Sequence, residues 1–382
     1  MRAISPVHFS VAPPFCREVA LLAQPWNREH AATPFVETAV NRFAVLLLLL
    51  LPWACAPSRA ETGQQRAEAA GRGLVGSPAP PLTLTTIDGK LVDLAGLYGR
   101  KAVYLKFWAT WCVPCREQMP HLERTFEQAG PELAVVAIDV GFDDSVDAVR
   151  AYRREAGLKM PIVFDADGTL GAAFNLRVTP QHVVIGRDGR IAYVGHMADA
   201  RLDAALQAAR KAPVRPVAAV AKATPPPSAV AVGGRLPALQ LTTLDGAVFR
   251  LADAVDRRPT VLVFLSPWCE SYLADSRPML AARCRAVREQ MTALSRHGSV
   301  RWIGISSGLW ANRDDLVRWR DEHRVGMPLA LDADGALFRR FGVMQVPTVL
   351  LADAQGRVVR RLVAPADLAD AVRPLLAAGR SP

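Results

Sequence analysis

The feature that most constrains the fold of this chain is an internal repeat of domain length. Four short signatures of the first half recur in the same order in the second half: 82–89 and 239–246, 111–112 and 268–269, 165–168 and 332–335, and 179–180 and 346–347. A repeat of this length indicates a duplicated domain and not a solenoid unit, and 382 residues suit two domains. We therefore predict domains at 76–211 and 234–378, joined by a Pro/Ala-rich linker at 212–233. The linker can reach about 65 Å if extended, so the domains need not touch.

Each copy alternates short apolar segments with amphipathic ones. In the first copy, residues 102–108 and 133–139 predict strands, and residues 145–155 and 201–211 predict helices. Residues 183–194 predict a hairpin around an Asp-Gly turn. Strands that alternate with helices, followed by a hairpin and a last helix, predict an α/β fold with a mixed central sheet flanked by helices.

Two cysteines separated by two residues, Cys112 and Cys115, carry the chemistry of the first copy. They follow the apolar strand and open a helix that we expect to break or kink at Pro120. At a helix N-terminus, partial positive charge and free N–H groups favour the thiolate of Cys112. A zinc site would normally need a second ligand pair, and none is suitably spaced. The pair therefore predicts thiol–disulfide exchange with no metal and no cofactor beyond its own disulfide. The alternatives are metal binding and a purely structural disulfide.

Residues 107–116, Phe-Trp-Ala-Thr-Trp-Cys-Val-Pro-Cys-Arg, resemble the active site of the TlpA/ResA-like thioredoxin-fold proteins. The resemblance covers about residues 76–205 and implies a thioredoxin fold. We therefore expect an α/β protein of two tandem thioredoxin-like domains. The resemblance also implies that Thr179 and Pro180 form the cis-proline loop facing the dithiol, and that this loop and Trp111 contact the substrate.

Members of this family are extracytoplasmic thiol–disulfide oxidoreductases, usually reductants, and some serve cytochrome c maturation. The leading hypothesis is thus an exported reductase of protein disulfides, in which Cys112 attacks and Cys115 resolves the mixed disulfide. The resemblance implies a membrane electron donor of the DsbD/CcdA type. Two other functions stay open, namely a dithiol oxidase or isomerase, and a client-binding, chaperone-like protein with a non-catalytic second domain.

Lys106 departs from the pattern, because thioredoxin itself has an acid at the matching strand position. A cation below the dithiol would tune the thiols by favouring a thiolate. The other interpretation is that Lys106 extends its ammonium to a sheet edge and packs its stem. The second copy has Val263 at this place.

The second copy keeps one motif cysteine, Cys269, and has Tyr272 at the position of the other. We therefore predict a degenerate domain without an intramotif disulfide. Cys284 lies on an apolar helical face, and one continuous helix would hold it about 20 Å from Cys269, so we expect a buried core thiol. Three hypotheses for Cys269 stay open: a relic in a partner-binding domain, a monothiol that exchanges with the first domain or a substrate, and a peroxidatic cysteine.

Residues 1–60 predict a mis-assigned start followed by a signal peptide. A basic residue at 42 precedes an apolar run at 44–54 and a Ser-x-Ala cleavage site that ends at Ala60. The segment predicts a periplasmic protein, and the alternative is an inner-membrane anchor with the domains facing the periplasm. The net charge of +10 includes no lysine-rich run or aromatic-interleaved basic stripe, so we expect no nucleic-acid partner.

Overall fold

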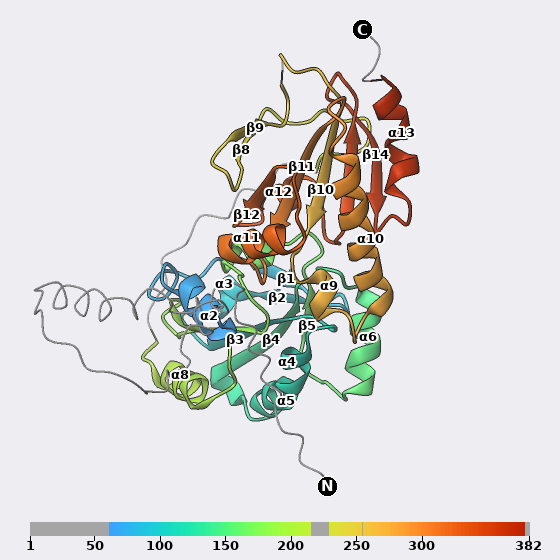
Figure 1. Ribbon diagram of the computed structural model, residues 1–382. Helices are drawn as coiled ribbons and strands as arrows, with labels where there is room; N and C mark the ends of the chain where they lie inside the picture. Colours follow the sequence, from blue (N-terminus) through green and yellow to red (C-terminus); the bar gives the residue numbers. More distant parts are fainter. Residues whose placement is uncertain (1–60, 215–228, 254, 379–382) are drawn as a thin grey trace, which may run out of the picture. The chain divides into compact units, whose positions relative to one another are not determined.

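The computed structural model describes residues 61–214, 229–253 and 255–378. These residues belong to one compact unit, Ala60–Pro382. The start and signal expected at 1–60 lie outside the described residues, as does most of the linker expected at 212–233. Two five-stranded sheets, each with its own helices, make up the described part (Figure 1).

The first sheet is mixed, and its central strand leads to the dithiol. The strand order is β5 (Ile162–Phe164), β4 (Leu133–Asp139), β3 (Ala102–Trp108), β6 (Gln181–Ile185) and β7 (Ile191–Gly195). Strand β3 pairs in parallel with β4 and antiparallel with β6. All seven residues of β3 are buried, as expected for an apolar strand covered on both faces.

Helices and a small hairpin surround this sheet. They are α2 (Gly63–Gly71), β1 (Thr83–Thr85), β2 (Leu91–Asp93), α3 (Leu94–Leu97), α4 (Val113–Glu117), α5 (Met119–Glu127), η4 (Gly130–Glu132), α6 (Val146–Glu155), α7 (Thr169–Ala173) and α8 (Ala200–Lys211). The break expected near Pro120 falls at Gln118, between α4 and α5, and Pro120 then occupies the first turn of α5, where a missing N–H is tolerated. Ser145 caps α6 by accepting the N–H of Ala148, which fixes the start of that helix.

The second sheet repeats this order and these strand directions. Its strands are β12 (Leu329–Asp332), β11 (Arg301–Ser307), β10 (Thr260–Leu265), β13 (Thr348–Ala352) and β14 (Val358–Val363). The elements around it are β8 (Gln240–Thr242), β9 (Val248–Arg250), α9 (Cys269–Tyr272), α10 (Pro278–Leu294), α11 (Arg313–Glu322), α12 (Ala336–Arg340) and α13 (Leu368–Ala378). The prediction of an α/β protein with two mixed sheets is confirmed.

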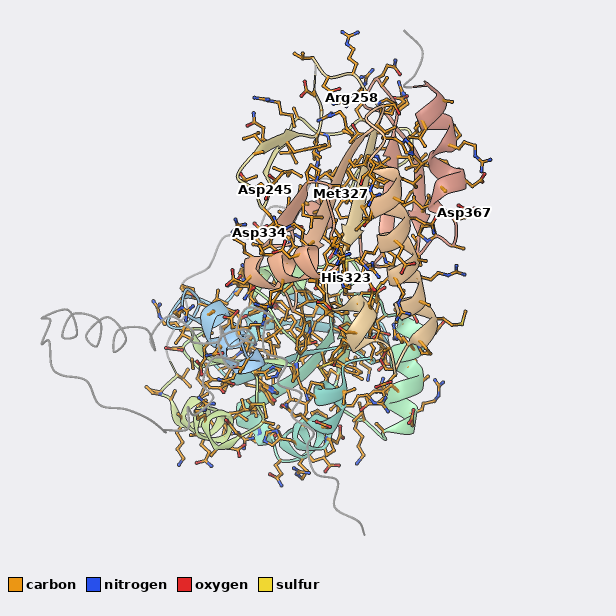
Figure 2. The ribbon with its side chains drawn as sticks, viewed as in Figure 1. Asp245, Arg258, His323, Met327, Asp334 and Asp367 are labelled. Atoms are coloured by element: carbon orange, nitrogen blue, oxygen red, sulfur yellow. A yellow bond between two sulfur atoms is a disulfide. The ribbon has the colours of Figure 1, made fainter. Side chains whose placement is uncertain are left out.

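Burial follows the apolar pattern of the sequence in the second domain as well. Charged side chains such as Asp245, Arg258 and Asp367 are exposed around it (Figure 2). Met327 is buried in an apolar cluster between its strands and helices. A second apolar cluster includes buried residues of both domains, among them Trp111 and Phe338, so the two domains share part of their core.

Candidate active site

The first motif forms a disulfide at the point where β3 passes into α4. Cys112 is the N-cap of α4 and Cys115 lies within its first turn, with a Cα–Cα distance of 5.2 Å. Both residues are fully buried. The strand, the tight connection and the short helix thus place the pair as the sequence predicts, and its role in exchange stays a prediction.

The peptide bond between Thr179 and Pro180 is cis, and β6 begins at the next residue. Strand β6 lies beside β3, which leads to the disulfide. Thr179 and Pro180 are buried. The structure therefore brings the expected loop to the strand that carries the dithiol, and substrate contact by this loop and by Trp111 stays a prediction.

Lys106 lies beneath the disulfide. Its side chain is fully buried, and its Nζ donates a hydrogen bond of 3.1 Å to the carbonyl oxygen of Cys115. Burial lowers the pKa of Lys106 from its ordinary value to about 7. The expectation of an ammonium at a sheet edge is wrong, because β3 is the central strand and has a neighbour on both sides. The amine is therefore placed where a change in its charge acts on the dithiol.

A buried hydrogen-bond chain connects the sheet to the break between α4 and α5. His182 pairs in register with Lys106, and its Nδ1 lies 2.8 Å from the hydroxyl of Tyr104. Its Nε2 lies 2.9 Å from Oε1 of Gln118. Burial, and then the nearby Lys106, hold the pKa of His182 well below its ordinary value, so the ring is neutral. In a neutral ring, Nε2–H donates to the Gln118 oxygen and Nδ1 accepts from Tyr104. Sequence reasoning missed Gln118, whose signal was its place at the break before Pro120.

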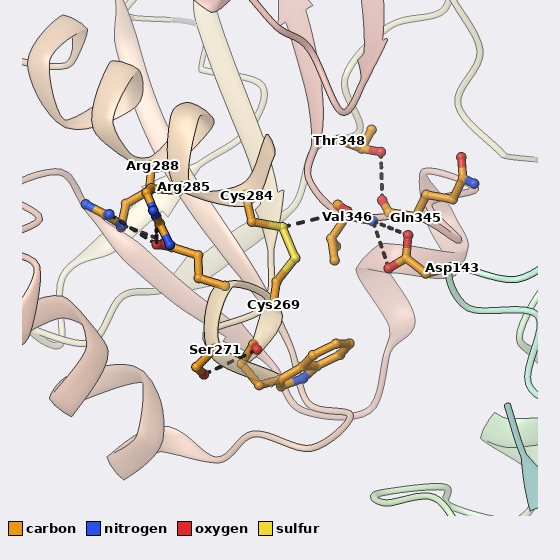
Figure 3. Close-up of a disulfide and its surroundings, with 11 residues drawn as sticks. Asp143, Cys269, Ser271, Cys284, Arg285, Arg288, Gln345, Val346 and Thr348 are labelled. Carbon is orange, nitrogen blue, oxygen red and sulfur yellow. Dashed lines mark hydrogen bonds and ion pairs between the residues drawn. A yellow bond between two sulfur atoms is a disulfide. The ribbon is translucent and has the colours of Figure 1, made fainter. Parts of the chain in front are cut away.

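The second domain contains a disulfide that sequence reasoning excluded. Cys269 and Cys284 are bonded, with a Cα–Cα distance of 6.2 Å (Figure 3). The expectation of a free core thiol at Cys284 is wrong, although the residue is buried. One continuous helix would separate the two by about 20 Å. Instead, α9 ends at Tyr272 and α10 begins at Pro278, and the turn between them folds the chain back.

This second disulfide occupies the same place in its domain as the first. Cys269 opens α9 directly after β10 and its connection, as Cys112 precedes α4. The Sγ of Cys284 lies 4.0 Å from the carbonyl oxygen of Val346, and the bond from Val346 to Pro347 is cis (Figure 3). Both domains thus carry a buried disulfide near the N-terminal end of the helix that follows the central strand.

The tryptophans that precede the two disulfides contact each other. The rings of Trp111 and Trp268 stack with centroids 5.3 Å apart and an interplanar angle of 22°. The hydroxyl of Tyr272 accepts a hydrogen bond of 3.2 Å from the N–H of Val113, the first residue of α4. The residue that replaces the second motif cysteine therefore covers the start of the helix that holds the first disulfide.

Two loops cross between the domains in a reciprocal way. The N–H of Asp143 donates to the carbonyl of Met344 at 2.7 Å, and the N–H of Trp310 donates to the carbonyl of Arg177 at 2.9 Å. Asp143 and Trp310 are equivalent positions of the repeat, and both have positive φ, 51° and 62°. Met344 and Arg177 each precede a cis-proline by three residues. The contact is therefore isologous, as between the subunits of a two-fold dimer.

Side chains of the same two loops reach the residues that precede the cis-prolines. Nε1 of Trp310 donates to the hydroxyl of Thr179 at 3.0 Å. The N–H of Val346 donates to both carboxylate oxygens of Asp143 at 3.3 Å. Burial raises the pKa of Asp143 to about 7, against the lowering effect of that N–H and of Arg277. The surface expected to meet an external substrate is thus occupied by the other domain, in both directions.

A cavity of about 230 Å³ lies on this interface. Equivalent positions of the two copies line it, such as Phe142 with Leu309 and Gly168 with Gly335. Arg277 adds an asymmetric bond, because its guanidinium donates to the hydroxyl of Thr110 at 3.1 Å and to the carbonyl of Asp143. The matched lining shows that the repeat extends to the surfaces by which the copies pack.

Comparisons with known proteins agree with this duplicated architecture. The AhpC/TSA family model matches residues 75–194 and 232–361, and the chain belongs to this family. The thiol–disulfide oxidoreductase ResA of Bacillus subtilis (strain 168) is 34% identical over 122 residues, which are 31% of this chain and 65% of that protein. The thioredoxin-like protein YneN of the same strain is 36% identical over 117 residues, which are 30% of this chain and 68% of that protein.

The chain spans just under two thirds of the length of the ResA relative. Among solved structures, a thiol:disulfide interchange protein of the thioredoxin family from Chlorobium tepidum TLS is 30% identical, with a TM-score of 0.32. That likeness covers 35% of this chain and 96% of the other.

Two features are absent from the described residues, namely a membrane-spanning helix and a cluster of metal ligands. Within the ranges given above, no helix has the length and apolar character needed to cross a bilayer. In the same part of the chain, no three His, Cys, Asp or Glu side chains gather in a way that could hold a metal ion.

Proposed function

We propose that this chain is an exported thiol–disulfide oxidoreductase that reduces protein disulfides through Cys112 and Cys115. The observation that carries the proposal is the Cys112–Cys115 disulfide at the start of α4, with the Lys106 amine bonded to the Cys115 carbonyl below it. Membership of the AhpC/TSA family and the relatives named thiol–disulfide oxidoreductases support it.

The proposed reaction proceeds in two exchanges. In the reduced protein, the Cys112 thiolate attacks one sulfur of a substrate disulfide, and the other substrate sulfur leaves as a thiolate. The Cys115 thiolate then attacks Sγ of Cys112 in the mixed disulfide, and the first substrate sulfur leaves. The substrate gains two electrons and two protons, and the Cys112–Cys115 disulfide is restored. The Lys106 amine, with a pKa of about 7, supplies a positive charge that stabilises a thiolate during these steps.

The finer parts of the proposal follow from the family resemblance. Trp111, Thr179 and Pro180 would hold an extended substrate against the dithiol, in the periplasm. A DsbD/CcdA-type membrane protein would return electrons to the disulfide, and apocytochrome c is one substrate to examine. Substrate access requires the second domain to move, because Trp268 and Trp310 contact Trp111 and Thr179.

The reduction potential of Cys112–Cys115 in the full chain tests the direction of the reaction. A value near or below about −270 mV, that of thioredoxin, supports a reductase, and a value near about −120 mV supports an oxidase. One observation favours the oxidase as a second candidate. The buried Lys106 amine stabilises a thiolate, and a stabilised reduced form makes the disulfide more oxidising.

A further inference from the structure

We propose that Cys269–Cys284 is a second redox site and that reduced Cys112 uses it as an internal disulfide substrate. The proposal rests on the proposed function, because it needs Cys112 to act as the attacking thiolate. It adds a site in the second domain and a transfer between the two domains. Three sets of observations carry it: the position of the second disulfide, the contact between the two active-site faces, and the burial of all four sulfurs.

The second disulfide lies at the position of a reactive cysteine pair and not at a distance from the active-site face, where a purely structural disulfide would be expected. Cys269 begins the helix after the central strand β10, and Cys284 lies against the carbonyl of Val346, the residue before a cis-proline. Cysteines 269 and 284 close a loop of 15 residues across the turn between α9 and α10. The second domain has therefore replaced the lost motif cysteine with one from the next helix, and it has kept a dithiol at the same face.

The contact between the faces brings the residues on both sides of Cys269 against the first domain. Cys269 lies between Trp268, which stacks on Trp111, and Tyr272, whose hydroxyl binds the N–H of Val113 next to Cys112. Cys269 is 1% exposed and Cys112 is 0% exposed, so solvent and external disulfides do not reach either sulfur in this arrangement. Among the described residues, Cys269–Cys284 is the disulfide of the second domain, and residues on both sides of Cys269 contact the first domain.

An external dithiol reduces the first pair while the second domain is moved away from it. Once the domains meet again, the transfer balances without a further reactant. The Cys112 thiolate attacks Sγ of Cys269, the bond from Cys269 to Cys284 breaks, and Cys284 leaves as a thiolate. The Cys115 thiolate then attacks Sγ of Cys112, and Cys269 leaves. Two electrons pass from the first pair to the second, and the Cys112–Cys115 disulfide forms again. Arg288 lines the same small cavity as Cys284, one helical turn on, and its guanidinium donates two hydrogen bonds to the carboxylate of Glu270, so this ion pair brings no net charge to the leaving thiolate.

The Cys115→Ala variant of the full chain isolates the first exchange. In this variant Cys112 has no resolving partner, so attack on Cys269 yields a Cys112–Cys269 disulfide and a free Cys284 without any oxidant. Acid quenching, alkylation and non-reducing peptide mapping detect this isomer. We expect the 112–269 peptide pair with alkylated Cys284. If Cys112 is alkylated and the 269–284 pair stays intact, the proposal is overturned.

A second measurement uses the wild-type chain and a matched variant. One equivalent of a dithiol is added at about 10 μM protein, and the free thiols at positions 269 and 284 are followed with time. A contacting domain has an effective concentration of about 1 mM, so transfer from a reduced first pair should be about 100-fold faster than direct attack of the dithiol on the second disulfide. In the wild type, positions 269 and 284 should therefore become free thiols as fast as the first pair is reduced, whereas in Cys112→Ala only the direct attack remains. Equal rates overturn the proposal.

Insulin reduction by the same samples separates this proposal from the proposed function. Normal insulin reduction with no transfer to positions 269 and 284 overturns the internal transfer alone. Loss of both in the wild-type chain overturns the proposed function as well. Cys115→Ser also removes the resolving thiol and replaces it with a side chain of similar size. This variant should give the same peptide pair as Cys115→Ala.

Discussion

The two domains have the same sheet and the same place for a disulfide, but they close that disulfide differently. The first uses two cysteines within one turn of α4, and the second uses Cys269 with Cys284 on the next helix. The first has a buried lysine below the pair, where the second has Val263. A duplicated fold can therefore keep a buried disulfide near a cis-proline while it loses the local motif and the buried charge.

The difference also assigns unequal roles. A dithiol within one helical turn needs no rearrangement to resolve a mixed disulfide, whereas Cys284 lies across a turn from Cys269. Tyr272, at the place of the lost cysteine, now contacts the first domain. We infer that the first domain attacks disulfides and that the second domain faces it as a partner.

The largest effect is expected from removal of the attacking thiol. Cys112→Ala should abolish insulin reduction by the full chain, because the remaining Cys115 is buried and has no partner. Cys115→Ala should instead accumulate mixed disulfides, because attack occurs and resolution does not. Turbidity assays and non-reducing gels measure both. Wild-type turnover by the Cys115→Ala variant would contradict the assigned roles.

A smaller effect is expected where the two domains meet. Trp268→Ala removes the ring that stacks on Trp111, and aromatic pairs contribute about 1 kcal/mol beyond the area they bury. With the lost burial, alkylation of reduced Cys112 should accelerate by about tenfold or more. Trp319→Phe, which alters a buried tryptophan of the other apolar cluster, is the control and should leave the rate unchanged. Equal rates in both variants would show that Trp268 does not cover Cys112.

The buried lysine should give the first domain a pH-dependent stability. The folded-state pKa of Lys106 is about 7 and its unfolded value is near 10.5, so the unfolded chain binds more protons between these pH values. The free energy of unfolding should rise with pH from 7 towards 10.5, by up to about 1.4 kcal/mol per pH unit.

Denaturant titrations of the oxidised protein between pH 7 and 9.5 measure that slope. Lys106→Met should remove this contribution. Lys159→Met, which removes an exposed lysine paired with Glu127, should keep it. A slope that survives in Lys106→Met would place the titrating group elsewhere.

The smallest expected effect comes from one hydroxyl. Tyr272→Phe removes the acceptor for the Val113 N–H and keeps the ring contacts with Trp111 and Trp268. The loss of one hydrogen bond should weaken the domain contact by about 1 kcal/mol, or about fivefold in Cys112 alkylation. A tenfold or larger effect would mean that the hydroxyl, and not the stacked rings, holds the faces together.

Long apolar strands and the repeat made most of the fold predictable. Strands β3 and β4 have the predicted bounds, because a strand buried on both faces has a continuous apolar sequence that turn residues interrupt sharply. The short strand β5 and the short helices α7 and α12 were not predicted, since three to five residues show no period.

The first disulfide could also be predicted from the sequence, because its two cysteines lie within one helical turn of each other. The pairing of Cys269 with Cys284 was not predicted, because the helical period of the apolar face of α10 was assumed to continue back to Cys269, across what is in fact a turn. Pro278, at the first position of α10, was the available signal that a new helix starts there. The reciprocal contact between the domains was not predicted, because the pattern of residues along the sequence does not show which surfaces fit together.

Each domain has its own disulfide, and non-reducing peptide mapping of the purified, alkylated protein tests this most directly. We expect the pairs Cys112–Cys115 and Cys269–Cys284, with no alkylation at any of the four positions. Alkylated Cys269 and Cys284 beside an intact first pair would contradict the account, since the second domain would then have two free thiols and no disulfide to offer.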